Sequence, residues 1–225
     1  MGVIASGASQ EVLVLGAALG LVALPLSVCL DVSPRWLRQL LIGCGALLAL
    51  RYLVMALSLA GGDARAWWGV RSLCSVHLIG LTWPAVVAAD QLIRNPAVTP
   101  KTLVRWYAPF LAISLFIMVF GHTGLMPAGG DEVRLALLGG WARLAGLLLG
   151  LFATALWAIG GAVWTRLPTG PVKAALTGLL GAYALVGLEG LVQATRPSPG
   201  PWMWPEMLAL VALWAALRAG QRASS

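Results

Sequence analysis

The sequence predicts an all-α fold, a single seven-helix transmembrane domain over residues 1–225. The first observation is composition: 60% of the 225 residues are hydrophobic and 10% are charged, whereas average soluble domains have about 45–50% and about 25%. The second is pattern, because the apolar residues form continuous runs of about 20 residues, the length of a spanning helix. The runs lack the period-two alternation of outer-membrane barrels. These features exclude a soluble globular protein, a disordered chain and a nucleic-acid-binding domain.

Seven apolar segments are long enough to cross a bilayer as helices. Turn-forming residues such as Ser33-Pro34, Gly61-Gly62 and Asn95-Pro96 separate them, and Pro171 begins the sixth at a position that favours proline. The fifth is long enough to tilt or to extend beyond the bilayer. The expected helices cover residues 11–31, 37–60, 71–93, 103–125, 133–165, 171–194 and 203–219.

The basic residues predict the orientation, because they gather in the loops of one side and cytoplasmic loops are rich in Lys and Arg. The N-terminus has no basic segment before its first apolar run, so it is expected to be a spanning helix and not a cleaved signal peptide. We therefore predict a multi-pass protein of the bacterial inner membrane, with its N-terminus outside and its C-terminus in the cytoplasm. The basic residues that give the net charge of +7 are then expected to contact anionic lipid headgroups and not nucleic acid. Nine basic residues mark the inner side: Arg35, Arg38, Arg94, Lys101, Arg105, Arg166, Lys173, Arg218 and Arg222. Four mark the outer side: Arg65, Arg71, Arg134 and Arg196.

Six ionisable side chains fall inside or at the ends of apolar segments, where a charge costs at least about 2.5–3.5 kcal/mol and therefore suggests a function. Their positions along the alternating helices place all six in the outer half of the membrane. We expect them to face one interior and to form a ligand-binding site that opens to the outside. The preferred ion pair is Arg51 with Glu189, followed by Arg143 with Glu206; the alternatives are pairs that only orient helices, or side chains that reach the headgroups. The six candidates are Arg51, His77, His122, Arg143, Glu189 and Glu206.

Soft ligands suggest an alternative metal site. Met118, His122 and Met126 are spaced i, i+4 and i+8, and Cys74 precedes His77 by three residues. Thiol, thioether and imidazole groups suit Cu(I), so the candidate copper ligands are His77, His122, Met118 and Cys74. The alternatives are methionines that fill apolar gaps, or a haem held by the two histidines. Apart from copper, no cofactor is expected.

Two GxxxG spacings, Gly16 with Gly20 and Gly146 with Gly150, allow close approach of helix backbones. We interpret both as packing within the bundle.

The stretch WGVRSLCSVHLIGLTWPAVVAADQLIRNPAVTPKTLVRWYAPFL resembles the seven-helix membrane sensor modules that precede AraC-type regulators or histidine kinases in bacteria. The resemblance covers the seven spans and implies a sensor. Those proteins carry a cytoplasmic effector domain, so this chain would signal through a separate protein partner. FGHTG and ATALWAIGGAV resemble parts of the CopD-type copper-resistance membrane proteins, which implies copper handling, although the histidine expected before the second motif is missing.

The sequence thus favours a non-enzymatic inner-membrane protein that binds a small ligand or ion, as a sensor, a transport component or a membrane subunit. Arg51 and Arg143 would receive an anionic group, while Glu189 and Glu206 would balance or gate them. No nucleophile, zinc or phosphate-loop signature occurs, and the seventh expected helix has no lysine for retinal. The alternatives are a copper-handling or other metal-handling membrane protein, and a membrane enzyme or assembly factor that acts on lipid-like substrates with His and Glu as acid and base.

Overall fold

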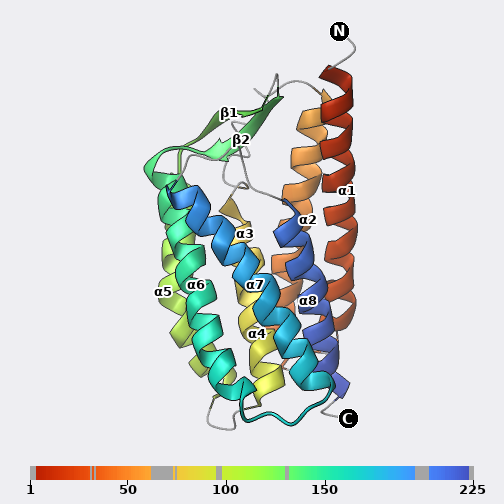
Figure 1. Cartoon of the computed structure of the whole chain (residues 1–225), viewed down its shortest axis with the longest axis vertical. Coiled ribbons are helices and arrows are strands. Elements are labelled where there is room, and N and C mark those ends of the chain that lie inside the picture. Colours follow the sequence, from red (N-terminus) through yellow and green to blue (C-terminus); the bar gives the residue numbers. More distant parts are fainter. Residues whose placement is uncertain are drawn as a thin grey trace.

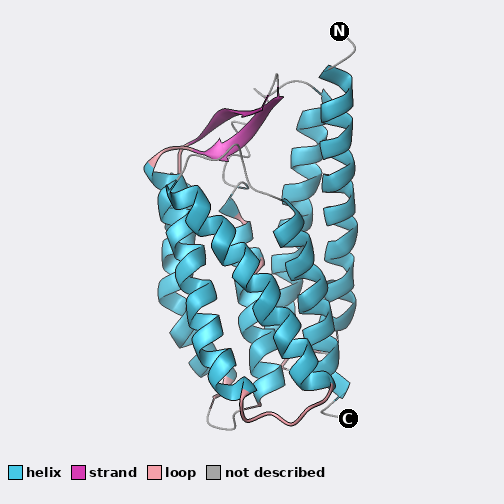
Figure 2. Cartoon of the chain, in the orientation of Figure 1, coloured by secondary structure: helices cyan, strands magenta, loops and turns pink. Residues whose placement is uncertain are grey.

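A computed structural model shows a bundle of helices that lie side by side, with a two-stranded hairpin at one end (Figures 1 and 2). It describes residues 4–30, 32, 34–61, 73, 75–94, 98–129, 132–195 and 203–222. The helices are α1 (Ile4–Cys29), α2 (Arg35–Gly61), α3 (His77–Gly80), α4 (Thr82–Ile93), α5 (Pro100–Phe120), α6 (Gly140–Trp164), α7 (Pro171–Thr195) and α8 (Met203–Arg222), and the strands are β1 (Thr123–Gly129) and β2 (Glu132–Leu137).

The predicted helical class is confirmed. Within the described ranges, α1, α2, α5, α6 and α7 each contain a segment long and apolar enough to cross a membrane. A shorter apolar stretch runs from His77 to Ile93 through α3 and α4. Helices of this length and composition are expected in a lipid bilayer, so the chain has the make-up of a multi-pass membrane protein.

The hairpin between α5 and α6 corrects two predicted helices. The fourth ends at Phe120 and not at 125, and the fifth begins at Gly140 because residues 132–137 form β2. The strands pair antiparallel, with Thr123 opposite Leu137. Gly139, with a φ of +54°, makes the turn from β2 into α6, a conformation that glycine adopts without steric cost. The apolar residues of 133–137 therefore belong to a strand, although their composition also suits a helix.

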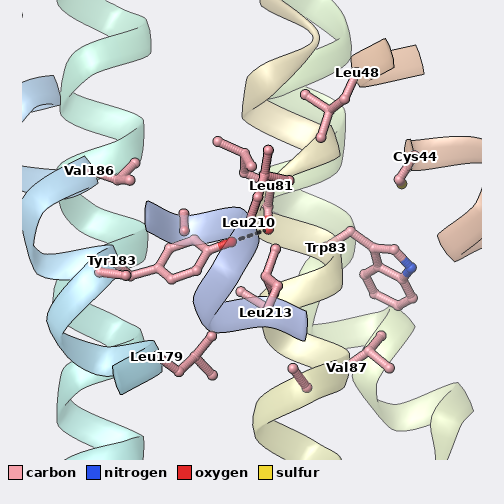
Figure 3. Packing of buried hydrophobic residues seen from close by; sticks show 14 of the residues in the cluster. Cys44, Leu48, Leu81, Trp83, Val87, Leu179, Tyr183, Val186, Leu210 and Leu213 are labelled. Carbon is pink, nitrogen blue, oxygen red and sulfur yellow. Dashed lines mark hydrogen bonds between the residues drawn. The ribbon is translucent and has the colours of Figure 1, made fainter. Parts of the chain in front are cut away.

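The third predicted helix is interrupted inside the bundle. Leu81 separates α3 from α4, because Pro84 has no N–H to donate to the carbonyl four residues earlier. Side chains from other helices bond to this segment. The Tyr183 hydroxyl of α7 donates to the Leu81 carbonyl oxygen at 2.5 Å, and the Thr82 hydroxyl is 2.6 Å from that of Tyr107. Polar contacts thus hold the segment around the break within an apolar core, and Figure 3 shows the one from Tyr183 to Leu81.

Glycines bring α6 and α7 into close contact. A Cβ atom on Gly146 would lie 2.1 Å from the Gly190 carbonyl oxygen, and one on Gly150 would lie 2.7 Å from Leu191. This GxxxG spacing is confirmed as a packing element. The other is not: among the described residues, no atom lies within 4 Å of a Cβ atom at Gly16 or Gly20, so these two glycines of α1 face away from the described part of the bundle.

The basic residues of the predicted inner side gather at one end of the bundle. The N-terminus and the hairpin lie at one end, and the C-terminus lies at the other (Figure 1). The turn from α1 to α2, the connection from α4 to α5 and the turn from α6 to α7 share the C-terminal end. All nine residues belong to these connections, to the helix turns that flank them, or to the last turns of α8.

Candidate functional site

A buried ion pair joins α2 to α8. The Nη1 atom of Arg51 lies 2.6 Å from Oε2 of Glu206, and its Nη2 atom lies 3.2 Å from Oε1. Arg51 is 1% exposed and Glu206 is 2% exposed. The guanidinium thus holds both carboxylate oxygens, the bidentate geometry that gives the strongest Arg–carboxylate contacts.

Tyr52 adds a third bond to the same carboxylate. Its hydroxyl donates to Oε2 of Glu206 at 2.6 Å, and its ring lies 5.2 Å from the Arg51 guanidinium carbon. Glu206 stands in the first turn of α8, where the positive end of the helix dipole favours a carboxylate. It follows Pro205, which is tolerated in a first turn because its missing N–H would have no partner within the helix.

His77 completes the group, which we name the Arg51–Glu206 cluster: Arg51, Tyr52, His77 and Glu206. The imidazole of His77 is half-buried at the start of α3 and lies within electrostatic range of the Glu206 carboxylate. The cluster therefore combines a guanidinium, a carboxylate, a phenol and an imidazole. Three of the six predicted ligand-binding residues come together here.

The predicted pairings are wrong. The partner of Arg51 is Glu206 and not Glu189, so Glu206 does not pair with Arg143. Glu189 is buried on α7, 7% exposed, and accepts a hydrogen bond at 3.0 Å from Gln193, one turn further along. Which carboxylate pairs with Arg51 depends on how the helices are arranged. Glu189 belongs to α7, which packs mainly against α6 and α8, whereas Arg51 belongs to α2.

Arg143 and His122 lie outside the cluster. Both are exposed, Arg143 in the first turn of α6 and His122 just after α5. The His122 ring stacks on Trp141 with 6.1 Å between ring centroids. An interfacial position, where long or amphipathic side chains reach the headgroups, fits these two residues better than the predicted shared interior.

The metal candidates are not brought together as one group in the described part of the chain. Cys74 lies outside the described residues, Met118 is half-buried on α5, and His122 is exposed. His77 stands near Glu206 instead. Among the described residues, no three His, Cys, Asp or Glu side chains are close enough to hold an ion. Copper binding stays a prediction.

Sequence reasoning missed Tyr52 and the polar residues in the middle of the bundle. The signal for Tyr52 was its position directly after Arg51 in LLALRYLVM. In the middle of the bundle, the Ser114 hydroxyl and the Trp83 indole nitrogen are buried, and neither has a hydrogen-bond partner among the described residues.

The chain matches no family model, no curated protein and no solved structure, so the two family resemblances stay predictions.

Proposed function

We propose that this chain is an inner-membrane protein of seven spans that binds a small charged ligand or ion at the Arg51–Glu206 cluster. The observation that carries the proposal is the bidentate pair of two almost fully buried charges, with a phenol bonded to it, inside an apolar bundle. Arg51 suits a carboxylate or phosphate group of a ligand, and Glu206 suits an ammonium group or a cation.

The cluster belongs to the outer half of the membrane in this proposal. Nine basic residues mark the end of the bundle that holds the C-terminus, and the positive-inside rule places that end in the cytoplasm. Glu206 lies in the first turn of α8, at the far end of that helix from Arg222. A ligand would therefore reach the cluster from outside, as a sensor or a transport component requires.

A purely structural role is the competing interpretation. An apolar set of similar volume often stabilises a fold as well as a buried ion pair does, or better. The matched variant is therefore the triple substitution Arg51→Met, Tyr52→Phe and Glu206→Leu, which removes the charges and leaves no phenol without an acceptor. A structural role predicts a folded variant that differs from the native chain in no binding property.

The test measures thermal unfolding of both proteins in detergent with acetate, phosphate, methylammonium, sodium and glycine as probes. A ligand that binds the folded state raises the unfolding temperature. Glycine carries both charges, so it could replace both halves of the pair without leaving a buried charge. We expect at least one probe to stabilise the native chain and not the triple variant. Equal responses of the two proteins to every probe would contradict the proposal.

Copper analysis of the purified native chain separates the metal alternative. Stoichiometric copper that is lost in the His77→Ala and His122→Ala variants would favour copper handling over the proposal.

A further inference from the structure

Helix α8 is held by polar contacts at both of its ends. At one end Glu206 binds Arg51 and Tyr52 of α2. At the other, Nη2 of Arg94 donates to the Gly220 carbonyl oxygen at 2.6 Å, and the Gln221 side-chain amide donates to the Val28 carbonyl oxygen at 2.8 Å. We name these last two bonds the inner clasp. The clasp ties α8 to the ends of α4 and α1, roughly 21 Å along the helix from Glu206 at the usual rise per residue.

The middle of α8 packs against its neighbours through a stripe of alanine and leucine side chains. Its members are exposed by 1% or less, and α8 as a whole contacts α1, α4 and α7. Figure 3 shows two of them, Leu210 and Leu213, in the same core as Leu81 and Leu179. Dispersion contacts have little directional preference, and packed helices can shift past one another by small sliding motions. The stripe consists of Ala209, Leu210, Leu213, Ala216 and Leu217.

The inner clasp is sensitive to such a shift. Arg94 ends α4 with a φ of 48°, a left-handed conformation that is uncommon for residues other than glycine and persists only where surrounding contacts hold it. Gly220 packs so closely on α4 that a Cβ atom there would lie 3.0 Å from Cβ of Gln91. A displacement of α8 along its axis would lengthen the bond from the Arg94 side chain to the Gly220 carbonyl oxygen.

We propose that α8 couples the Arg51–Glu206 pair to the inner clasp, so that opening the pair loosens the opposite end of the bundle. The natural trigger, a ligand that competes for Arg51 or Glu206, rests on the proposed function. The coupling itself rests on the contacts of α8 alone. Through this coupling, binding at the Arg51–Glu206 cluster would change the end of the bundle on which a cytoplasmic partner would act.

Hydrogen exchange of the full chain in detergent micelles, read by mass spectrometry, tests the coupling. The Glu206→Gln variant opens the pair, and Tyr183→Phe is the control because it removes a buried phenol bond in the same core but outside α8. Relative to residues 150–160 of α6, which report the overall loss of stability, we expect the Glu206→Gln variant to exchange about fivefold faster or more at residues 91–94 and 217–222, and the control to show no such excess there. Faster exchange confined to residues 203–210 of the Glu206→Gln variant would overturn the coupling.

A second variant reads the coupling in the opposite direction, because coupling between two sites is reciprocal. Arg94→Gln removes the Arg94–Gly220 bond of the clasp at an exposed position and leaves the Gln221–Val28 bond in place. We expect faster exchange at residues 204–207, and native exchange there would overturn the proposal even if the Glu206→Gln variant failed to fold. If a probe binds but the exchange rates show no coupling, the proposed function stands and the coupling fails. If the exchange rates show coupling but no probe binds, the coupling stands and the proposed function fails.

Discussion

Arg51 of α2 and Glu206 of α8 form a bidentate ion pair, with nitrogen–oxygen distances of 2.6 and 3.2 Å. The two residues are 155 positions apart in the chain, so the pair fixes how the C-terminal helix sits against the N-terminal helix pair. The hydroxyl of Tyr52 bonds to the same carboxylate. Because the charges are compensated where they lie, the bundle can carry them inside an apolar interior.

Removing one charge of the pair should cost far more stability than removing both. Glu206→Gln leaves the Arg51 guanidinium buried without its counter-charge, and we expect a loss of about 3–5 kcal/mol in the free energy of unfolding. The triple variant Arg51→Met, Tyr52→Phe and Glu206→Leu should stay within about 1 kcal/mol of the native chain or exceed it. Denaturant unfolding in mixed micelles measures both; a single variant as mild as the triple variant would refute the expectation.

The hydroxyls of two buried tyrosines should contribute differently to the free energy of unfolding. Tyr52 donates to a carboxylate, whereas Tyr183 donates to the Leu81 backbone carbonyl. Bonds to charged groups contribute about 1.5–3 kcal/mol and neutral ones about 0.5–1.5 kcal/mol. We therefore expect Tyr52→Phe to lower the free energy of unfolding more than Tyr183→Phe does, in the same unfolding assay. The reverse order would show that the phenol of Tyr52 adds little to the cluster.

The two GxxxG spacings should respond oppositely to alanine. Gly146→Ala forces a methyl group against the Gly190 carbonyl oxygen, and such overpacking costs about 1–3 kcal/mol. The methyl group of Gly16→Ala meets no atom of the described residues within 4 Å, and alanine has the higher helix propensity by about 1 kcal/mol. Unfolding temperatures in detergent should fall for the first variant and hold or rise for the second. Equal losses would mean that α1 uses its glycines in a contact that this chain alone does not contain.

The orientation of the bundle can be read from two exposed positions. His122 follows α5 at the hairpin end, and Thr169 lies between α6 and α7 at the opposite end. In a chain whose native cysteines are replaced by serine, we expect a membrane-impermeant maleimide on intact cells to label His122→Cys and not Thr169→Cys. Labelling of the lysed cells is the control for reactivity. The opposite pattern would reverse the predicted orientation and place the Arg51–Glu206 cluster in the inner half.

Much of the helical architecture could be predicted from the sequence because each helix carries its own signal. Apolar length, turn residues and Pro171 located α7 within one residue of its observed end. The segment after Phe120 shows the limit. Residues 133–137 are apolar enough to extend a helix, but their pairing with 123–127 depends on residues across a turn, which composition alone does not reveal.

The sequence by itself determined the apolar helical class and the position of each ionisable residue along its helix, because composition and order are properties of the chain. It identified Arg51, His77 and Glu206 as residues that an apolar bundle must accommodate. Only the tertiary structure decided that Arg51 binds Glu206, and that His122 and Arg143 are exposed. The physical reason is that position along a helix leaves two quantities open: which helices are neighbours, and how each is rotated about its axis.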